Sequence, residues 1–216
     1  MGRGVILSKS FYQVTRDLHL YLGLFISPFV LLFAISVIFL VHSWIPGMTS
    51  NPHPSRSTAS NLRLAPNLDQ LSARELVDAV RPTLDQIGVT GEVQFIRHVP
   101  KEHRVLVPVT IPGCETLVNI DLLTRTAEIT RRDTGIWDAL VVLHKSPGPH
   151  LTAIRMNWFL FRVWQWLADT TVYLLFFISV SGIYLWVVLR AERRTGLVLL
   201  AAGAFSFFGI VYALSH

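Results

Sequence analysis

The sequence predicts an integral membrane protein with three transmembrane α-helices and a small α+β module outside the bilayer. Three stretches carry no Lys, Arg, Asp or Glu, at residues 18–55, 170–189 and 195–216. Each stretch has the roughly twenty apolar residues that an α-helix needs to cross about 30 Å of hydrocarbon. Buried helices of a soluble protein can be this apolar, but three of them in 216 residues are unusual. We therefore expect the lipid bilayer to be the first partner of this chain.

Basic residues near the spans indicate the orientation. They are Arg3, Lys9 and Arg16 before the first span, and Arg190, Arg193 and Arg194 between the second and the third. Short loops rich in Lys and Arg stay in the cytoplasm, so the N-terminus and the second loop are expected inside. The formal net charge of +5 then reflects basic residues that set the orientation in the membrane. It gives no reason to expect nucleic acid binding. The first apolar run is longer than the core of about 7–15 residues in a signal peptide, so an uncleaved anchor is expected.

These patterns divide the chain into segments. The expected segments are a cytoplasmic N-terminus at 1–17, transmembrane helices at 18–42, 167–189 and 196–214, a linker without regular structure at 43–68, an α+β module at 69–133, a membrane-surface segment at 134–166 and a cytoplasmic loop at 190–195. The surface segment is expected to form amphipathic helix, broken at the Ser-Pro-Gly-Pro sequence 146–149.

The module is expected to pack one helix on a small antiparallel sheet. Ser72 and Glu75 form a capping-box pattern, apolar residues recur at helical spacing up to residue 84, and Gly88 ends the helix. Pro82 is expected to bend or shorten this helix. Strand patterns follow at 92–98, 104–111 and 117–121, with a fourth candidate at 127–131.

The remaining composition excludes several kinds of site. The single cysteine, Cys114, cannot form an intrachain disulfide or a thiolate metal cluster, and we interpret it as a small residue beside a turn. The sequence has no internal repeat, no Gly-rich phosphate loop and no HExxH or GxSxG motif.

An ordered set of short motifs resembles the PepSY-associated transmembrane proteins. Residues 16–23 (RDLHLYLG) resemble the R-x-x-H-x-x-x-G start of that family, and residues 118–129 (VNIDLLTRTAEI) are similar to the strand–turn–strand of a PepSY module. Leu143-His144 and residues 181–186 (SGIYLW) resemble the later LH and TGLYLW-like motifs. The turn reads LLTRT where the family more often has Pro and Gly, and the chain is shorter than relatives with more spans.

The resemblance implies residence in a bacterial inner membrane, with the PepSY module facing the periplasm. Some members of the family are linked with siderophore uptake and act as haem-containing reductases of ferric siderophores. Membership does not settle the activity of this chain, because one fold hosts many functions.

Three histidines are the candidate haem ligands. His19 and His42 bracket the first span, about 34 Å apart at 1.5 Å per residue. Ionisable residues at membrane depth are functional candidates, although both histidines could instead lie in the interface. Gly23 lies one turn after His19 and could leave room for a flat macrocycle, or it could simply let two helices approach closely. Gly182 on the second span is compatible with either role.

A haem b with two axial ligands needs both imidazoles at one depth. On the outer side, His42 and His144 are the best intramolecular pair, with His150 as a further candidate. His19 has no histidine partner on the inner side. It would need a five-coordinate iron, another kind of ligand, or His19 of a second subunit in a homodimer. A spacing of 23 residues turns a straight helix by about 140°, so His19 and His42 share a face only if Pro28 kinks the helix.

Two functions of different classes are compatible with these patterns. The first is support of siderophore-iron uptake by haem-b electron transfer to a periplasmic ferric complex, which would make the protein a ferric-siderophore reductase. The second is a non-enzymatic membrane anchor whose module binds a periplasmic protein or peptide through an edge strand.

Overall fold

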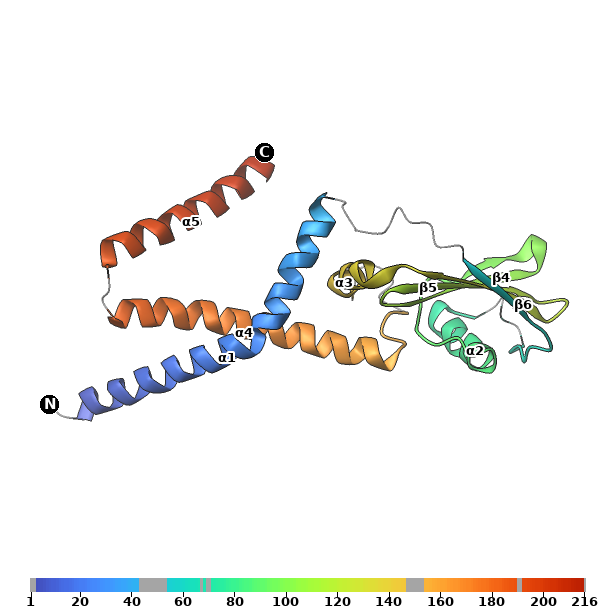
Figure 1. Ribbon diagram of the computed structural model, residues 1–216, viewed down its shortest axis with the longest axis horizontal. Coiled ribbons are helices and arrows are strands. Elements are labelled where there is room, and N and C mark those ends of the chain that lie inside the picture. The colour runs from blue at the N-terminus through green and yellow to red at the C-terminus, as the bar shows by residue number, and fades with distance from the viewer. Residues whose placement is uncertain are drawn as a thin grey trace. The chain divides into compact units, whose positions relative to one another are not determined.

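The computed structural model describes residues 3–42, 54–66, 68, 71–146, 154–189 and 192–215 (Figure 1). The helices are α1 (Arg3–His42), α2 (Ala73–Gln86), α3 (Gly135–Lys145), α4 (Phe159–Leu189) and α5 (Arg193–Ser215), with one 3-10 turn, η1 (Pro100–Glu102). The strands are β1 (Ser55–Ala59), β2 (Glu92–Val93), β3 (Arg97–Val99), β4 (Arg104–Ile111), β5 (Cys114–Asp121) and β6 (Thr126–Asp133). The chain forms two compact units, residues 1–28 with 170–216, and residues 29–169.

Three helices are long and apolar enough to cross a membrane, which confirms the fold class expected from the sequence. The candidate spans are Ser10–His42, Phe159–Leu189 and Arg193–Ser215. Helix α1 already begins at Arg3, within the expected N-terminal segment, and α4 begins eight residues before the expected start at residue 167.

The expected surface segment 134–166 is therefore divided between α3 and the first turns of α4. Arg162 lies within α4, and its guanidinium carbon is 5.9 Å from the centre of the Phe159 ring on the same helix. Helix α3 ends at Lys145, and the expected break at 146–149 lies largely outside the described residues.

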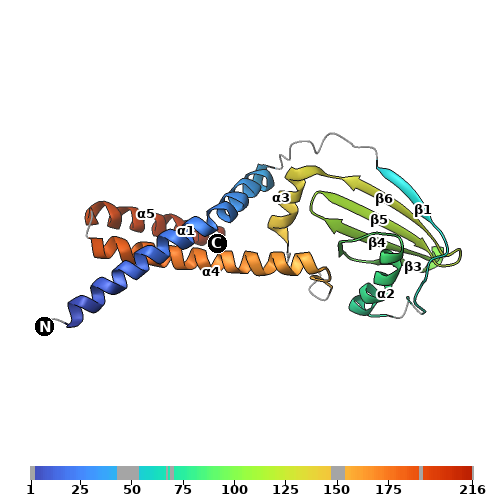
Figure 2. The same ribbon diagram turned by 60° about the horizontal axis from the view of Figure 1, so that its bottom comes forward.

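The second unit contains a six-stranded antiparallel sheet in the order β1-β6-β5-β4-β2, with β3 also paired to β4 (Figure 2). Helix α2 covers one face of this sheet. The core between them is apolar because side chains alternate along each strand, so every second residue faces α2. Its members include Leu76, Val77, Val80 and Leu84 of α2, and Val105, Val107, Val109, Val118, Ile120 and Ala127 of the sheet.

The cap predicted for α2 is present. The backbone N–H of Ser72 donates to the Glu75 carboxylate at 3.0 Å, and this pairing with Ser72 lowers the pKa of Glu75. Gly88 follows the helix with a positive φ of 72°, which glycine adopts without strain. The helix contains Pro82 and continues to Gln86, so the proline does not shorten it.

Strand β1 corrects the expectation of an irregular linker at 43–68. Residues Ser55–Ala59 pair antiparallel with β6, from Ser55 opposite Arg131 to Ala59 opposite Ala127. The sequence SRSTA has no apolar alternation because the outer strand is almost wholly exposed. Pairing with β6, rather than burial, is what makes this segment a strand.

The expected strand at 92–98 is divided into β2 and β3, and Pro108 of β4 explains the interruption. The carbonyl oxygen of Pro108 accepts a hydrogen bond of 2.8 Å from the Gln94 N–H, so the Pro108 backbone faces this edge of the sheet. Proline has no N–H to return, and the ladder therefore lacks one bond between Val93 and Arg97.

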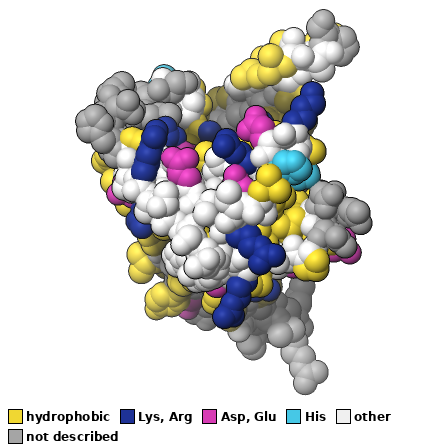
Figure 3. Space-filling view, turned by 90° about the vertical axis from the view of Figure 1, so that its right-hand side faces the viewer, with side chains coloured by type: hydrophobic (Ala, Val, Ile, Leu, Met, Phe, Trp, Pro, Cys, Tyr) yellow, Lys and Arg dark blue, Asp and Glu magenta, His cyan; other side chains and the backbone are white. Residues whose placement is uncertain are grey.

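The outer face of the sheet has charges of both signs. Arg132 contacts Glu115 and Arg56 contacts Glu128, and all four side chains are about half-exposed or more. Figure 3 likewise shows basic and acidic side chains interspersed on one face of the molecule. A face with charges of both signs favours neither an anionic nor a cationic ligand.

Candidate functional site

His19 of α1 contacts α4 through a buried serine. Its Nδ1 atom lies 2.8 Å from Oγ of Ser181, and Ser181 is only 4% exposed. The same hydroxyl lies 3.2 Å from the carbonyl oxygen of Ile178, one turn earlier in α4. The His19 imidazole is therefore held from the neighbouring helix within the first compact unit.

His144 at the end of α3 is held in the same way by α1. Its Nδ1 atom lies 2.9 Å from Oγ of Ser36, which is fully buried. Oγ of Ser36 also lies 2.8 Å from the carbonyl oxygen of Phe33. The Phe33 ring packs edge-on against the imidazole, with ring centres 5.4 Å apart.

Each serine hydroxyl lies within hydrogen-bonding distance of a histidine Nδ1 and of a carbonyl oxygen of its own helix. A hydroxyl has one hydrogen, which it can donate to only one of these two acceptors. When it donates to the carbonyl oxygen, its own oxygen accepts a hydrogen bond from the histidine Nδ1–H. The neutral imidazole then keeps its lone pair on Nε2, which is the state needed to bind a metal or accept a proton.

The two candidate glycines, Gly23 and Gly182, face different side chains. A Cβ atom on Gly182 would lie 3.4 Å from Cε1 of His19, so the missing side chain leaves room for the imidazole. A Cβ atom on Gly23 would instead lie 3.6 Å from Cδ1 of Ile178. Gly182 therefore belongs to the His19 site, whereas Gly23 faces a side chain of α4.

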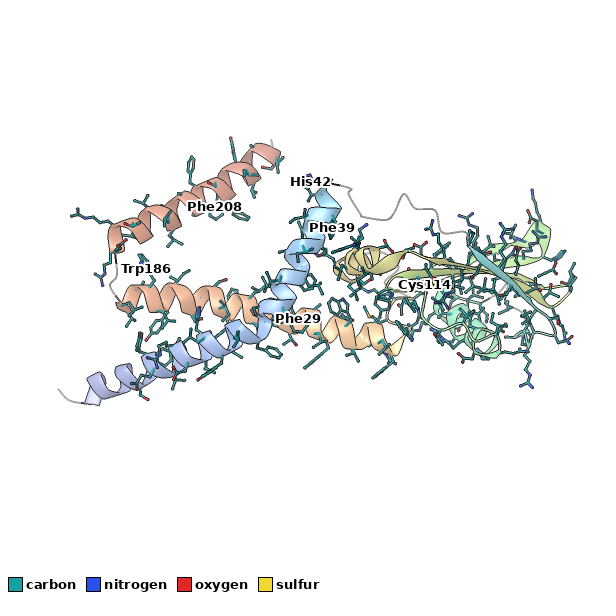
Figure 4. All side chains as sticks on the ribbon, in the orientation of Figure 1. Phe29, Phe39, His42, Cys114, Trp186 and Phe208 are labelled. Carbon is teal, nitrogen blue, oxygen red and sulfur yellow. The ribbon has the colours of Figure 1, made fainter. Side chains whose placement is uncertain are left out.

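His42 does not share the face of α1 that contacts His144. It is exposed at the last residue of α1 (Figure 4), six residues after Ser36. Six residues turn an α-helix by about 240°, so the two side chains leave the helix in different directions. His150, the further candidate, lies outside the described residues.

Each pair offers one imidazole of the kind that could hold a haem. A proximal imidazole with its Nδ1–H bonded and its Nε2 free is a normal haem ligand. Among residues 3–28, 170–189 and 192–215, His19 is the only histidine. Within the described residues, no group of three His, Cys, Asp or Glu side chains could hold a metal ion without haem.

Two further described histidines and the single cysteine lie outside these pairs. His98 is in β3, and His103 follows η1 with a positive φ of 51°. Cys114 is a free, buried thiol that begins β5 directly after the Pro112-Gly113 turn, as expected (Figure 4). Burial is the main cause that raises the pKa of this thiol, and it does not form a nucleophilic site.

Sequence reasoning missed both serines and a second polar cluster. The missed cluster comprises Arg81, Glu92 and Asn157. Burial raises the pKa of the Glu92 carboxyl, and this outweighs the opposing effects of the backbone N–H groups of residues 156–158 and of the Arg81 charge. Acidic residues are rarely buried unless paired, but burial is set by tertiary packing, which no local pattern reveals.

The comparison with known families accounts for almost the whole chain. The family model described as PepSY_TM-like matches residues 13–215. The chain belongs to the PepSY_TM-like family. This confirms the resemblance drawn from the short motifs, and the match includes both histidine–serine pairs. No curated protein and no solved structure matches this PepSY_TM-like protein.

Proposed function

We propose that this PepSY_TM-like protein is a haem-b electron carrier of the bacterial inner membrane. In this role it passes electrons to ferric complexes in the periplasm, such as ferric siderophores, and so supports iron uptake. The observation that carries the proposal is the pair of histidines held by buried serines, at His19–Ser181 and His144–Ser36. In the tautomer whose Nδ1–H is bonded to serine, each imidazole keeps its lone pair on Nε2, and each lies on a helix packed against a candidate membrane span.

The residues of the chain would orient the ligands and exclude water. Ser181 and Ser36 hold the two imidazoles by their Nδ1–H groups and prevent them from rotating. Phe33 packs against both His144 and Trp164, with its ring centre 5.4 Å from the first ring and 6.0 Å from the second. Haem, when bound, would supply one-electron chemistry at its iron. A second group that helps to hold the haem would come from a second subunit or from a residue other than histidine.

The proposed orientation follows from charge. Arg16 precedes the apolar part of α1, and Arg193 and Arg194 begin α5, so these ends are expected in the cytoplasm. The sheet and α2 would then face the periplasm, where ferric siderophores arrive. The resemblance to siderophore-linked PepSY proteins supports this substrate class.

An absorption spectrum of the purified protein tests the proposal. Protein solubilised from haem-replete cells should show a Soret band that shifts on dithionite reduction. We expect His19→Ala and His144→Ala each to diminish this band, because each removes an axial ligand. His98→Ala, on the sheet, is the matched control and should leave it unchanged. Colourless wild-type protein would contradict the electron-carrier proposal.

A second function is favoured by the free edge of the sheet. Strand β1 is the terminal strand, and no described strand pairs with its outer side. The two-residue loop Pro112-Gly113 makes Ile111–Cys114 a hydrogen-bonded pair, and alternation across the register directs the backbone groups of Thr58 outward. An extended peptide of a periplasmic partner could add a strand there. In this alternative the protein is a non-enzymatic anchor.

A further inference from the structure

Residues just before α4 complete the core of the sheet module. Ile154 is 3% exposed and belongs to the same apolar core as the residues of α2 and the sheet. It lies more than twenty residues after β6, which is the last strand of the module. The module is therefore discontinuous in sequence, with α3 inserted between its two parts.

Asn157 binds the edge of the sheet as a neighbouring strand would. Its Oδ1 atom accepts a 3.0 Å hydrogen bond from the N–H of Val93, and its Nδ2 atom donates to the Val93 carbonyl oxygen at 2.8 Å. The same amide also donates to the Ile154 carbonyl oxygen at 2.8 Å. One side chain thus satisfies both backbone groups of a strand residue and fixes its own loop.

Glu92, adjacent in β2, binds the backbone at the start of α4. Its carboxylate accepts hydrogen bonds from the N–H of Asn157 at 3.2 Å and from the N–H of Trp158 at 2.8 Å. The first N–H groups of a helix have no partner within the helix and carry a partial positive charge. A buried carboxylate from another element therefore caps α4 from outside.

Arg81 of α2 closes the cluster. It donates to the carbonyl oxygen of Gly91 at 3.0 Å, to the carbonyl oxygen of Asn157 at 3.1 Å and to Oδ1 of Asn157. The positive charge of Arg81 also favours the ionised form of the buried Glu92 carboxyl. Three elements, α2, β2 and the start of α4, therefore meet in one polar network.

We infer that the Arg81–Glu92–Asn157 cluster clamps the module to Asn157 and Trp158, immediately before α4, so that the module and the start of α4 move as one body. The start of α4, which lies in the same compact unit as the sheet, is then part of the module rather than a flexible tether. A partner or ligand that displaces the module consequently displaces the start of α4. This inference requires neither haem nor an edge-strand partner.

Hydrogen exchange of the full-length protein in detergent micelles tests the clamp. In Asn157→Ala, we expect the amides of Val93, Asn157 and Trp158 to exchange about tenfold faster or more, because local opening no longer breaks the Asn157 hydrogen bonds. Glu92→Gln is the milder variant, since it keeps the shape of the side chain. Glu115→Gln, an exposed carboxylate paired with Arg132, is the matched control and should leave these amides unchanged.

Exchange in the milder Glu92→Gln variant shows whether faster exchange reflects loss of the clamp or unfolding of the whole module. Faster exchange confined to residues 93 and 157–158, with unchanged protection of β4 and β5, supports the clamp. Unchanged exchange at these three amides would overturn the inference. A uniform increase across β4 and β5 would also overturn it, because the cluster would then be part of the general core.

A distance measurement tests the rigid coupling itself. Spin labels on Glu128→Cys in β6 and Val163→Cys in α4, with Cys114→Ala to remove the native thiol, should give a narrow distance distribution. Adding Asn157→Ala should broaden it. A broad distribution without that substitution would show that the module and α4 already move independently.

Discussion

Ser36 and Ser181 do more for the candidate site than any residue other than the histidines themselves. Ser27 and Ser179 make the same hydroxyl bond to their own helix backbone, but Ser27 is half-buried and Ser179 is exposed, and neither is joined to a described histidine by a hydrogen bond. The sequence cannot separate these two kinds of serine, because bonding to the preceding turn is common in apolar helices. Only the packing of a second helix shows which hydroxyl meets an imidazole.

This contrast gives a matched pair of variants on α4. We expect Ser181→Ala to free Nδ1 of His19 and to mix the two neutral tautomers, because the substitution removes the hydroxyl oxygen that lies 2.8 Å from this nitrogen. Nitrogen-15 spectra of ring-labelled histidine in alkaline buffer report the tautomers. Ser179→Ala changes the same chemical group two residues away and should leave the His19 signals in place. Equal effects of both substitutions would argue against a fixed tautomer.

At the scale of elements, the sequence predicts capped helices and strands with buried residues well. It predicts poorly the features that depend on which strands pair. The strand expected at 104–111 has the bounds of β4, and buried valines alternate with half-buried residues along it. Strand β1 has no such pattern, and its structure depends on β6 as a partner. The interruption between β2 and β3 depends on Pro108, which lies in a different strand. Neither the existence of β1 nor the interruption between β2 and β3 can therefore be predicted from the residues of those segments alone.

The free edge at β1 permits an element-scale prediction. Thr58→Pro removes an N–H that points away from β6, so the sheet should stay folded. If a periplasmic partner adds a strand there, this substitution should abolish its capture in a crosslinking experiment. Val107→Pro is the unfolding control, since it removes a bond between β4 and β5. Capture that survives Thr58→Pro would place the partner away from this edge, with residues 136–166 as the next segment to test.

At the scale of the whole molecule, the sequence predicts what hydropathy controls. Three candidate spans and one α+β module follow from apolar length and strand alternation, and all are present. The way the module joins the membrane helices does not follow. Glu92 lies 65 residues before Asn157, and the two meet only because the core and the start of α4 are packed together. Long-range polar contacts of this kind have no period that a sequence could display.

The orientation of the whole chain can be tested with reporters. Basic residues near the short segments should keep Arg193 and the N-terminus in the cytoplasm, because translocating short basic loops is unfavourable. Alkaline phosphatase, which is active only after export, should therefore be active when fused after Gly113 and inactive when fused within residues 190–194. A fluorescent protein that folds only in the cytoplasm should show the opposite result at each site. The reverse pattern would place the sheet module in the cytoplasm, where it could not meet a periplasmic ferric complex, and both proposed functions would fail together.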